Sequence, residues 1–163
     1  MSAVTIRTAH PEDARTVLEL TRALARFIKA EDWFLATLAD VERDCFGPAP
    51  RYEAWLAEVK GAPAGLATLF PTYSTFKAKP CLFVDSLYVD ETARGYGVGK
   101  VLMRHICQLA IERDCVRVDL NVLNWNPARS FYTGLGMQET GELGMSITGA
   151  ALRSLAGPDQ PAA

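Results

Sequence analysis

The segment Arg-Gly-Tyr-Gly-Val-Gly-Lys at residues 94–100 constrains the fold of this chain more than any other part of the sequence. It follows an apolar run at 82–89 that is typical of a central strand, and it precedes a helical pattern that continues to about residue 114. A glycine-rich turn between a strand and a helix points several backbone N–H groups one way, at the positive end of the helix, where an anion is stabilised. The segment therefore predicts a phosphate or pyrophosphate site, and glycines that serve only the bend are the alternative.

Two common phosphate-binding loops do not fit this segment. A P-loop requires a glycine five residues before Gly99, where this chain has Arg94. It also requires a serine or threonine after Lys100, where this chain has Val101. The dinucleotide-binding fingerprint requires its third glycine at the position of Lys100. Neither of these loops explains the glycines.

Apolar periodicity along the whole chain predicts an α/β fold of the mixed α+β kind, a mixed sheet with helices on its faces. Strands are expected at 4–7, 52–59, 66–70, 82–89 and 116–122, with a hairpin turn at 60–65 and a return to strand from Met137 that includes 145–148. Helices are expected from Pro11 through residue 28, at 33–46, from the glycine turn to about 114, and at 127–135, closed by Gly136. His105 is expected to be a satisfied core histidine, and Trp55 is expected to pack.

The length and composition exclude several classes of protein. The 163 residues fit one domain, expected at 1–156, with a flexible tail at 157–163. The net charge of −2 and the lack of a polybasic run argue against nucleic-acid and membrane partners. No apolar stretch approaches the roughly 20 residues that span a bilayer, and the N-terminus lacks the apolar part of a secretory signal. The four cysteines form no CxxC and only two histidines are present, so we expect no metal site, free buried thiols and a cytoplasmic location.

The pattern Arg94-x-x-Gly97-x-Gly99 resembles the acyl-CoA pyrophosphate loop of the GCN5-related N-acetyltransferases (GNAT). A second segment at 122–136, Val-Leu-Asn-Trp-Asn-Pro-Ala-Arg-Ser-Phe-Tyr-Thr-Gly-Leu-Gly, is similar to the second CoA segment of that family. Segments at 44–47, 73–77, 85–89 and 123–126 are similar to the diamine (spermidine/spermine and thialysine) acetyltransferase branch. The resemblance covers roughly residues 4–146 and implies the GNAT fold, a mostly antiparallel twisted sheet with helices on both faces.

The resemblance implies acetyl-CoA as the acetyl donor, no metal and a homodimer. Backbone groups of Leu87, Tyr88 and Val89 would pair with the pantetheine arm like an extra strand. The pyrophosphate would lie in the loop formed by Arg94, Gly95, Tyr96, Gly97, Val98, Gly99 and Lys100. Asn126 would meet the cofactor arm or serve only as a helix cap, and Arg129 would approach the CoA phosphates or lie on a solvated face.

Tyr132 matches the general-acid tyrosine of the family. When an amine attacks a thioester a thiolate must leave, and a positioned phenol can protonate its sulfur. Asp85 stands where the branch carries glutamate and would take a proton from the amine through a water, because aspartate is one methylene shorter. The alternatives are that Tyr132 packs as an aromatic residue and that Asp85 is an ordinary strand carboxylate.

Departures from the branch bear on the acceptor. Ser86 and Asn124 replace acidic residues, and Ile28 stands where a substrate-binding glutamate is expected, although Glu31 is close. Trp33, Phe34 and Trp125 are candidates for the rim of the acceptor site. The predicted function is acetyl transfer to a primary amine of a small molecule (a diamine, polyamine or amino-acid analogue), with long polyamines less favoured because carboxylates are missing. A protein or peptide lysine N-acetyltransferase and a non-catalytic acyl-CoA-binding module are the alternatives.

Overall fold

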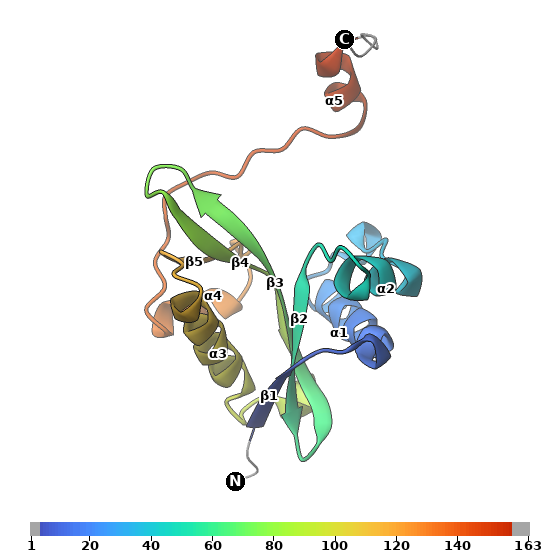
Figure 1. Cartoon of the computed structure of the whole chain (residues 1–163), viewed down its shortest axis with the longest axis vertical. Coiled ribbons are helices and arrows are strands. Elements are labelled where there is room, and N and C mark those ends of the chain that lie inside the picture. The colour runs from blue at the N-terminus through green and yellow to red at the C-terminus, as the bar shows by residue number, and fades with distance from the viewer. Residues whose placement is uncertain (1–3, 158–163) are drawn as a thin grey trace. The chain divides into compact units, whose positions relative to one another are not determined.

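A five-stranded sheet organises the chain up to Arg129 in the computed structural model, which describes residues 4–157. Its strands lie in chain order: β1 (Val4–Thr8), β2 (Glu53–Val59), β3 (Ala62–Ser74), β4 (Lys79–Val89) and β5 (Val118–Leu120). The first four strands pair antiparallel, whereas β5 pairs parallel to β4. The predicted mixed and mostly antiparallel sheet is therefore confirmed, and Figure 1 shows its twist.

Helices cover both faces of this sheet, as predicted (Figure 1). They are α1 (Ala14–Phe27), α2 (Leu38–Phe46) and α3 (Val98–Glu112), with 3-10 turns at Pro11–Asp13, Glu31–Trp33 and Glu91–Ala93. α1 and α2 pack over one face through a buried apolar cluster that includes Leu56 and Leu66 of the sheet. On the opposite face Trp55 of β2 contacts His105 of α3, with ring centroids 4.2 Å apart. Successive strand residues point to opposite faces, which explains why Leu56 and Trp55 meet different helices.

A polar network fixes the entry of the chain into α1. The Arg7 guanidinium donates to the two carboxylate oxygens of Asp13 at 2.6 and 2.9 Å and to Glu58 at 2.8 Å. The Asp13 carboxylate also accepts the backbone N–H of His10 at 2.8 Å. The hydrogen bonds from Arg7 hold the pKa of Asp13 below its ordinary value. The network joins β1 and β2 to the start of α1, which begins after Pro11 as the sequence predicts.

The predicted helix at 33–46 is wrong in its first part, because α2 begins at Leu38. Thr37 and Asp40 form a capping box: the Thr37 hydroxyl accepts the Asp40 amide at 3.3 Å, and the Asp40 carboxylate accepts the Thr37 amide at 2.9 Å.

The strand predicted at 116–122 is too long, because β5 has only the three residues Val118–Leu120. The hairpin turn predicted at 60–65 is limited to Lys60 and Gly61, because β3 already begins at Ala62.

The second compact unit comprises the described residues 130–157. α4 (Ala128–Gly134) leads into it, and α5 (Gly149–Ala156), which the sequence analysis does not predict, ends it. The strand predicted from Met137, including 145–148, is wrong: within the described chain, 137–148 forms no strand pair, and Gly141 has a φ of +75°. A strand needs a hydrogen-bonded neighbour, which alternating apolar residues alone do not supply. The run Ala150, Ala151 and Leu152 explains α5, because these residues favour helix.

The four cysteines are free thiols, as expected, but their burial differs. Cys45 and Cys81 are buried, Cys115 is half-buried and Cys107 is exposed, so the expectation of buried thiols is wrong for Cys107. Over residues 4–157 no helix is long and apolar enough to cross a membrane. One domain at 1–156 stays a prediction, and the predicted tail at 157–163 lies outside the described residues apart from Gly157.

Candidate functional site

Asp85 occupies a β-bulge in β4. In the register between β3 and β4, Thr68 faces Ser86 and Leu69 faces Val84, which leaves Asp85 as the extra residue. The Ser86 amide donates to the Thr68 hydroxyl at 3.1 Å. Val84 and Ser86 are buried, whereas Asp85 is exposed. The bulge therefore presents a single carboxylate to solvent from the middle of a central strand.

The strand edge beyond this bulge is open. The ladder between β4 and β5 consists of the pairs Leu82↔Val118, Phe83↔Asp119 and Val84↔Leu120. Leu87, Tyr88 and Val89 pair with β3 on one side, and over residues 4–157 no strand pairs with them on the other. Main-chain groups on an open edge can bind an extended ligand as an added strand. The structure thus supplies the exposed edge that the predicted pantetheine contact requires.

The glycine segment turns β4 into α3 and leaves backbone donors unused. Gly95 and Gly97 have φ values of +85° and +76°, and a Cβ at either position would meet nothing within 4 Å. Glycine is therefore required by backbone conformation and not by crowding. Gly97 is the N-cap of α3, and no side chain caps this end of the helix. The first helical bond is from the Val101 amide to the Gly97 carbonyl at 3.1 Å, so the amides of 98–100 have no acceptor within the helix.

These amides meet the requirements of an anion site, because they lie at the positive end of a 15-residue helix. Arg94 and Lys100 flank them, and both side chains are exposed. Arg94 also approaches Glu91, with Nη1 3.3 Å from Oε1, and its Cζ lies 4.8 Å from the centroid of the Phe27 ring. The end of α1 therefore adjoins the loop. The structure brings the predicted residues 87–89 and 94–100 into one continuous strand edge and turn.

Gly65, which the sequence analysis places in a turn, lies inside β3 and sets the position of α3. A Cβ at Gly65 would lie 2.9 Å from the backbone oxygen of Tyr88, 3.1 Å from Val98 Cγ1 and 3.3 Å from Leu102 Cδ1. The missing side chain lets the first turn of α3 pack directly on the sheet beside β4. A glycine within a strand often marks such a close approach, which is the signal that the sequence analysis missed.

The second CoA-like segment forms a capped helix start. The Asn126 side-chain oxygen accepts the Ala128 amide at 2.9 Å, which confirms its expected role as a cap. Arg129 Nη1 donates to the Asn124 carbonyl at 3.1 Å, and the Arg129 side chain is exposed. Contacts of Asn126 and Arg129 with a cofactor stay predictions.

Tyr132 belongs to α4 and to the second compact unit. Its ring meets the Phe131 ring edge to face, with centroids 5.2 Å apart, and the residue is half-buried. Burial raises the pKa of Tyr132 above its ordinary value. The phenol therefore keeps its proton at neutral pH, as an acid must before it acts. Its role as the general acid stays a prediction.

His105 packs against its neighbours as predicted, but one of its ring nitrogens has no hydrogen-bond partner among the described residues. Burial lowers the pKa of His105, and its Nε2 atom is buried without a hydrogen-bond partner among the described residues. The expectation of a satisfied core histidine is therefore wrong in that respect. Its contact with Trp55 places it among packing residues of α3, and Trp55 packs as predicted.

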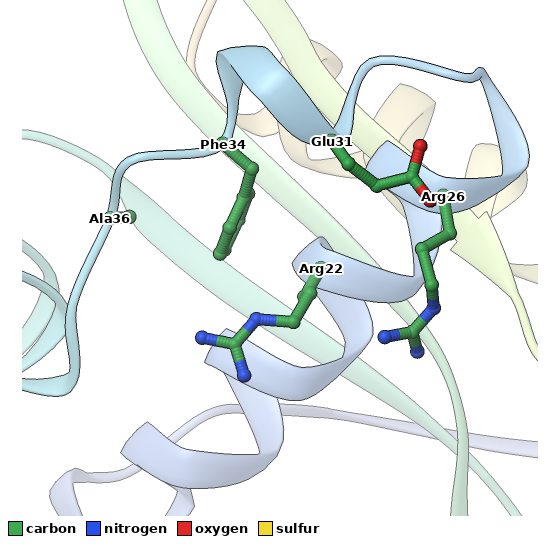
Figure 2. A pocket seen from close by; sticks show the side chains of 5 residues that line it. All are labelled: Arg22, Arg26, Glu31, Phe34 and Ala36. Atoms are coloured by element: carbon green, nitrogen blue, oxygen red, sulfur yellow. The ribbon is translucent and has the colours of Figure 1, made fainter.

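A pocket of about 250 Å³ opens beside the end of α1 (Figure 2). Its lining residues come from α1 and from the segment that follows it, namely Arg22, Arg26, Glu31, Phe34 and Ala36. Phe34 and Glu31 are residues that the sequence analysis links to the acceptor. Trp33 is 75% exposed and does not line this pocket. The two arginines were missed, although their spacing of four residues on a helix could have indicated a shared face.

The chain is similar to several known proteins along most of its length. The acetyltransferase (GNAT) family model matches residues 17–137. The chain is 31% identical to the thialysine N-epsilon-acetyltransferase of Bos taurus, over 96% of this chain and 99% of that protein. It is 30% identical to the spermidine/spermine N(1)-acetyltransferase-like protein 1 of Homo sapiens, over 80% of this chain and 20% of that protein. Among solved structures, an integron cassette protein of V. cholerae has a TM-score of 0.79 at 24% identity, covering 97% of this chain and 99% of its own.

Proposed function

Because this chain belongs to the acetyltransferase (GNAT) family, we propose that it transfers an acetyl group from acetyl-CoA directly to a primary amine of a small molecule. The observation that carries the proposal is the open edge of β4, which leads directly into the uncapped amides of α3. An extended arm with a negatively charged group at its end matches these two features together. The names of the relatives, which refer to thialysine and polyamine acetylation, support a small amine as the acceptor.

The residues present fit the proposed donor. The open edge at 87–89 would hold the pantetheine arm, and the amides of 98–100 would hold the pyrophosphate. Arg94 and Lys100 supply positive charge, and open space around Gly95 and Gly97 lets phosphate oxygens approach the backbone. Asn126 and Arg129 complete the proposed set. Acetyl-CoA supplies an acetyl group activated as a thioester.

Asp85 is proposed to accept a proton from the amine through a water. An amine with an ordinary pKa near 10.4 is neutral in only about one molecule in 10³ at pH 7, which corresponds to about 4.6 kcal/mol. A carboxylate close to the amine eases this loss of a proton. The exposed position of Asp85 on the bulge supports this role, because a water can lie between the carboxylate and an incoming amine.

Tyr132 is proposed to donate its phenolic proton to the departing sulfur. During the transfer the amine nitrogen bonds to the acetyl carbon while the carbon–sulfur bond breaks. From the ammonium form the nitrogen loses two protons, one through water to Asp85 before it attacks and one to solvent as the amide forms. Tyr132 gives one proton to the thiolate and is reprotonated from solvent, so the net change is the release of one proton. A tyrosine phenol is protonated at neutral pH, as a proton donor must be before it acts, and the half-buried position of Tyr132 keeps it in that form.

We also propose that the enzyme is a cytoplasmic homodimer. Several large apolar side chains of the second unit are exposed, Leu143 by 91% and Met145 by 95%, and a second copy of the chain would cover them. The four unpaired cysteines support a reducing compartment. Light scattering at two protein concentrations tests the dimer, and a monomer at both would refute it.

The function is tested by calorimetric titration with acetyl-CoA and by release of free thiol with a panel of amines. The panel contains thialysine, L-lysine, spermidine and a lysine-containing peptide. We expect acetyl-CoA binding and turnover of at least one small amine. Absence of binding would refute the cofactor site, and turnover of the peptide alone would show a protein N-acetyltransferase instead.

A further inference from the structure

The pocket at the end of α1, here called the arginine pocket, is lined by Arg22, Arg26, Glu31, Phe34 and Ala36 (Figure 2). Its charge pattern is one that α1 does not need for its own stability. Arg22 and Arg26 are one helical turn apart and extend from the same face of α1. Like charges at this spacing weaken a helix slightly. Within residues 4–157 neither guanidinium forms an ion pair, so neither positive charge is neutralised by a neighbouring carboxylate.

Phe34 contacts the Arg22 side chain, and both arginines are accessible. The Arg22 guanidinium carbon lies 5.3 Å from the centroid of the Phe34 ring. Such a contact uses no N–H···O hydrogen bond, and for Arg22 and Arg26 no side-chain hydrogen bond to another described residue is observed. Both arginine side chains are exposed, and a ligand can therefore reach them. Two such guanidiniums match a carboxylate, which binds arginine through paired hydrogen bonds.

The arginine pocket borders the proposed acetyl-CoA site. Phe27, the last residue of α1, lies beneath Arg94 of the pyrophosphate loop, with 4.8 Å between the Arg94 Cζ and the ring centroid. Burial raises the pKa of Tyr88 on β4, and the positive charges of Arg94 and Arg26 oppose that rise. The Arg26 charge is therefore within electrostatic reach of β4. The helix that carries Arg22 and Arg26 therefore packs against the strand that carries the open edge.

We propose that the arginine pocket binds the α-carboxylate of the acceptor, so that the substrate class is a diamino acid with a distal primary amine. Arg22 and Arg26 hold the carboxylate, and Glu31 holds the α-ammonium group, which together match a zwitterion. The distal amine is then the group left to receive acetyl. A polyamine lacks a negative charge for the two guanidiniums and brings cations next to them. The inference rests on the proposed acetyltransferase function and names its acceptor.

The test compares acceptors that differ only at the carboxylate. L-Lysine and L-lysinamide form one pair, and thialysine and its carboxamide form a second. We expect the free acids to have the higher kcat/KM, by about ten- to a hundredfold, because charge-assisted hydrogen bonds are lost with the amides. Arg22→Gln and Arg26→Gln should each reduce this preference through KM and leave the KM for acetyl-CoA unchanged. Arg15→Gln is the matched control, because Arg15 is an exposed arginine of the same helix outside the pocket.

Other results would overturn either the carboxylate-binding proposal or the proposed function. Equal kcat/KM for acid and amide would overturn the proposal, as would a preference that survives both substitutions. A raised KM for acetyl-CoA in the two variants would also overturn it, because the arginines would then serve a CoA phosphate. If no amine is acetylated although acetyl-CoA binds, the proposed function fails. Titration of the CoA-bound protein with the acid and amide pairs then tests carboxylate binding by the arginine pocket separately. Equal affinities for acid and amide would overturn that proposal.

Discussion

Replacing Gly97 by alanine separates a backbone requirement from a ligand requirement. Gly97 has a φ of +76°, and a Cβ there would meet nothing within 4 Å. The substitution therefore causes no clash in the free chain, and its cost comes from the left-handed conformation, about 1–2 kcal/mol. For a chain of this size this corresponds to a fall in Tm of about 2–8 °C. The added methyl group would nevertheless occupy the space through which we expect phosphate oxygens to approach the amides.

Gly61 provides the matched control. It has a φ of +77°, and a Cβ there also meets nothing within 4 Å, but it lies in the turn between β2 and β3. Gly61→Ala and Gly97→Ala should therefore lower Tm by similar amounts. Only Gly97→Ala should weaken acetyl-CoA binding, by at least about tenfold, as expected from the loss of one hydrogen bond to a charged group. Calorimetric titration and thermal unfolding measure the two effects. Equal acetyl-CoA affinity in both variants would refute the assignment of Gly97 to the pyrophosphate loop.

Three further predictions follow from the same structure. Tyr132→Phe should lower kcat by about 10²-fold or more while acetyl-CoA affinity stays unchanged, and stopped-flow or steady-state rates comparable to the parent chain would remove Tyr132 as the acid. Asp85→Asn should lower kcat/KM most at low pH, where the amine is most fully protonated, and a uniform loss at every pH would argue against proton removal by Asp85. Asp13→Asn should lower the free energy of unfolding at pH 7 by about 1–3 kcal/mol, because the partners Arg7 and His10 lose a carboxylate. The folded pKa of Asp13 is lowered from 3.8, so its contribution to stability is present above that value and is lost as pH falls through the folded pKa. Urea unfolding at pH 7 and at acid pH measures the free energy of unfolding of both chains. A stability difference between parent and variant that persists at acid pH would contradict this account.

The glycine turn was predictable because its chemistry is local. Positive φ at Gly95 and Gly97 and the helix that begins at Val98 depend on residues next to one another in sequence. The same holds for the cap at Asn126, whose side chain bonds an amide two residues away. Such features can be inferred from a single chain because no distant partner is needed.

Features that depend on distant partners were not predictable. The bulge at Asp85 exists only in the register with Thr68, and the alternation of apolar residues in β4 gives no sign of an extra residue. The structural role of Gly65 depends on α3, which packs beside it.

The start of α2 at Leu38 was missed although its signal is local, because the Thr37 capping box competes with an apolar pattern that begins earlier. The arginine pocket was missed because exposed arginines on a helix usually serve only solubility.

The early end of the ladder between β4 and β5 has a consequence for amide hydrogen exchange. Main-chain groups of Leu87 and Val89 that face away from β3 have no strand partner within residues 4–157. Their amide hydrogens on that side should exchange quickly even though β4 is central in the sequence of strands. If a pantetheine arm completes the sheet at this edge, deuterium uptake there should slow when acetyl-CoA is added, while the strands on the far side keep their rates. The cofactor would then act as part of the secondary structure, and its removal would leave a gap in the sheet.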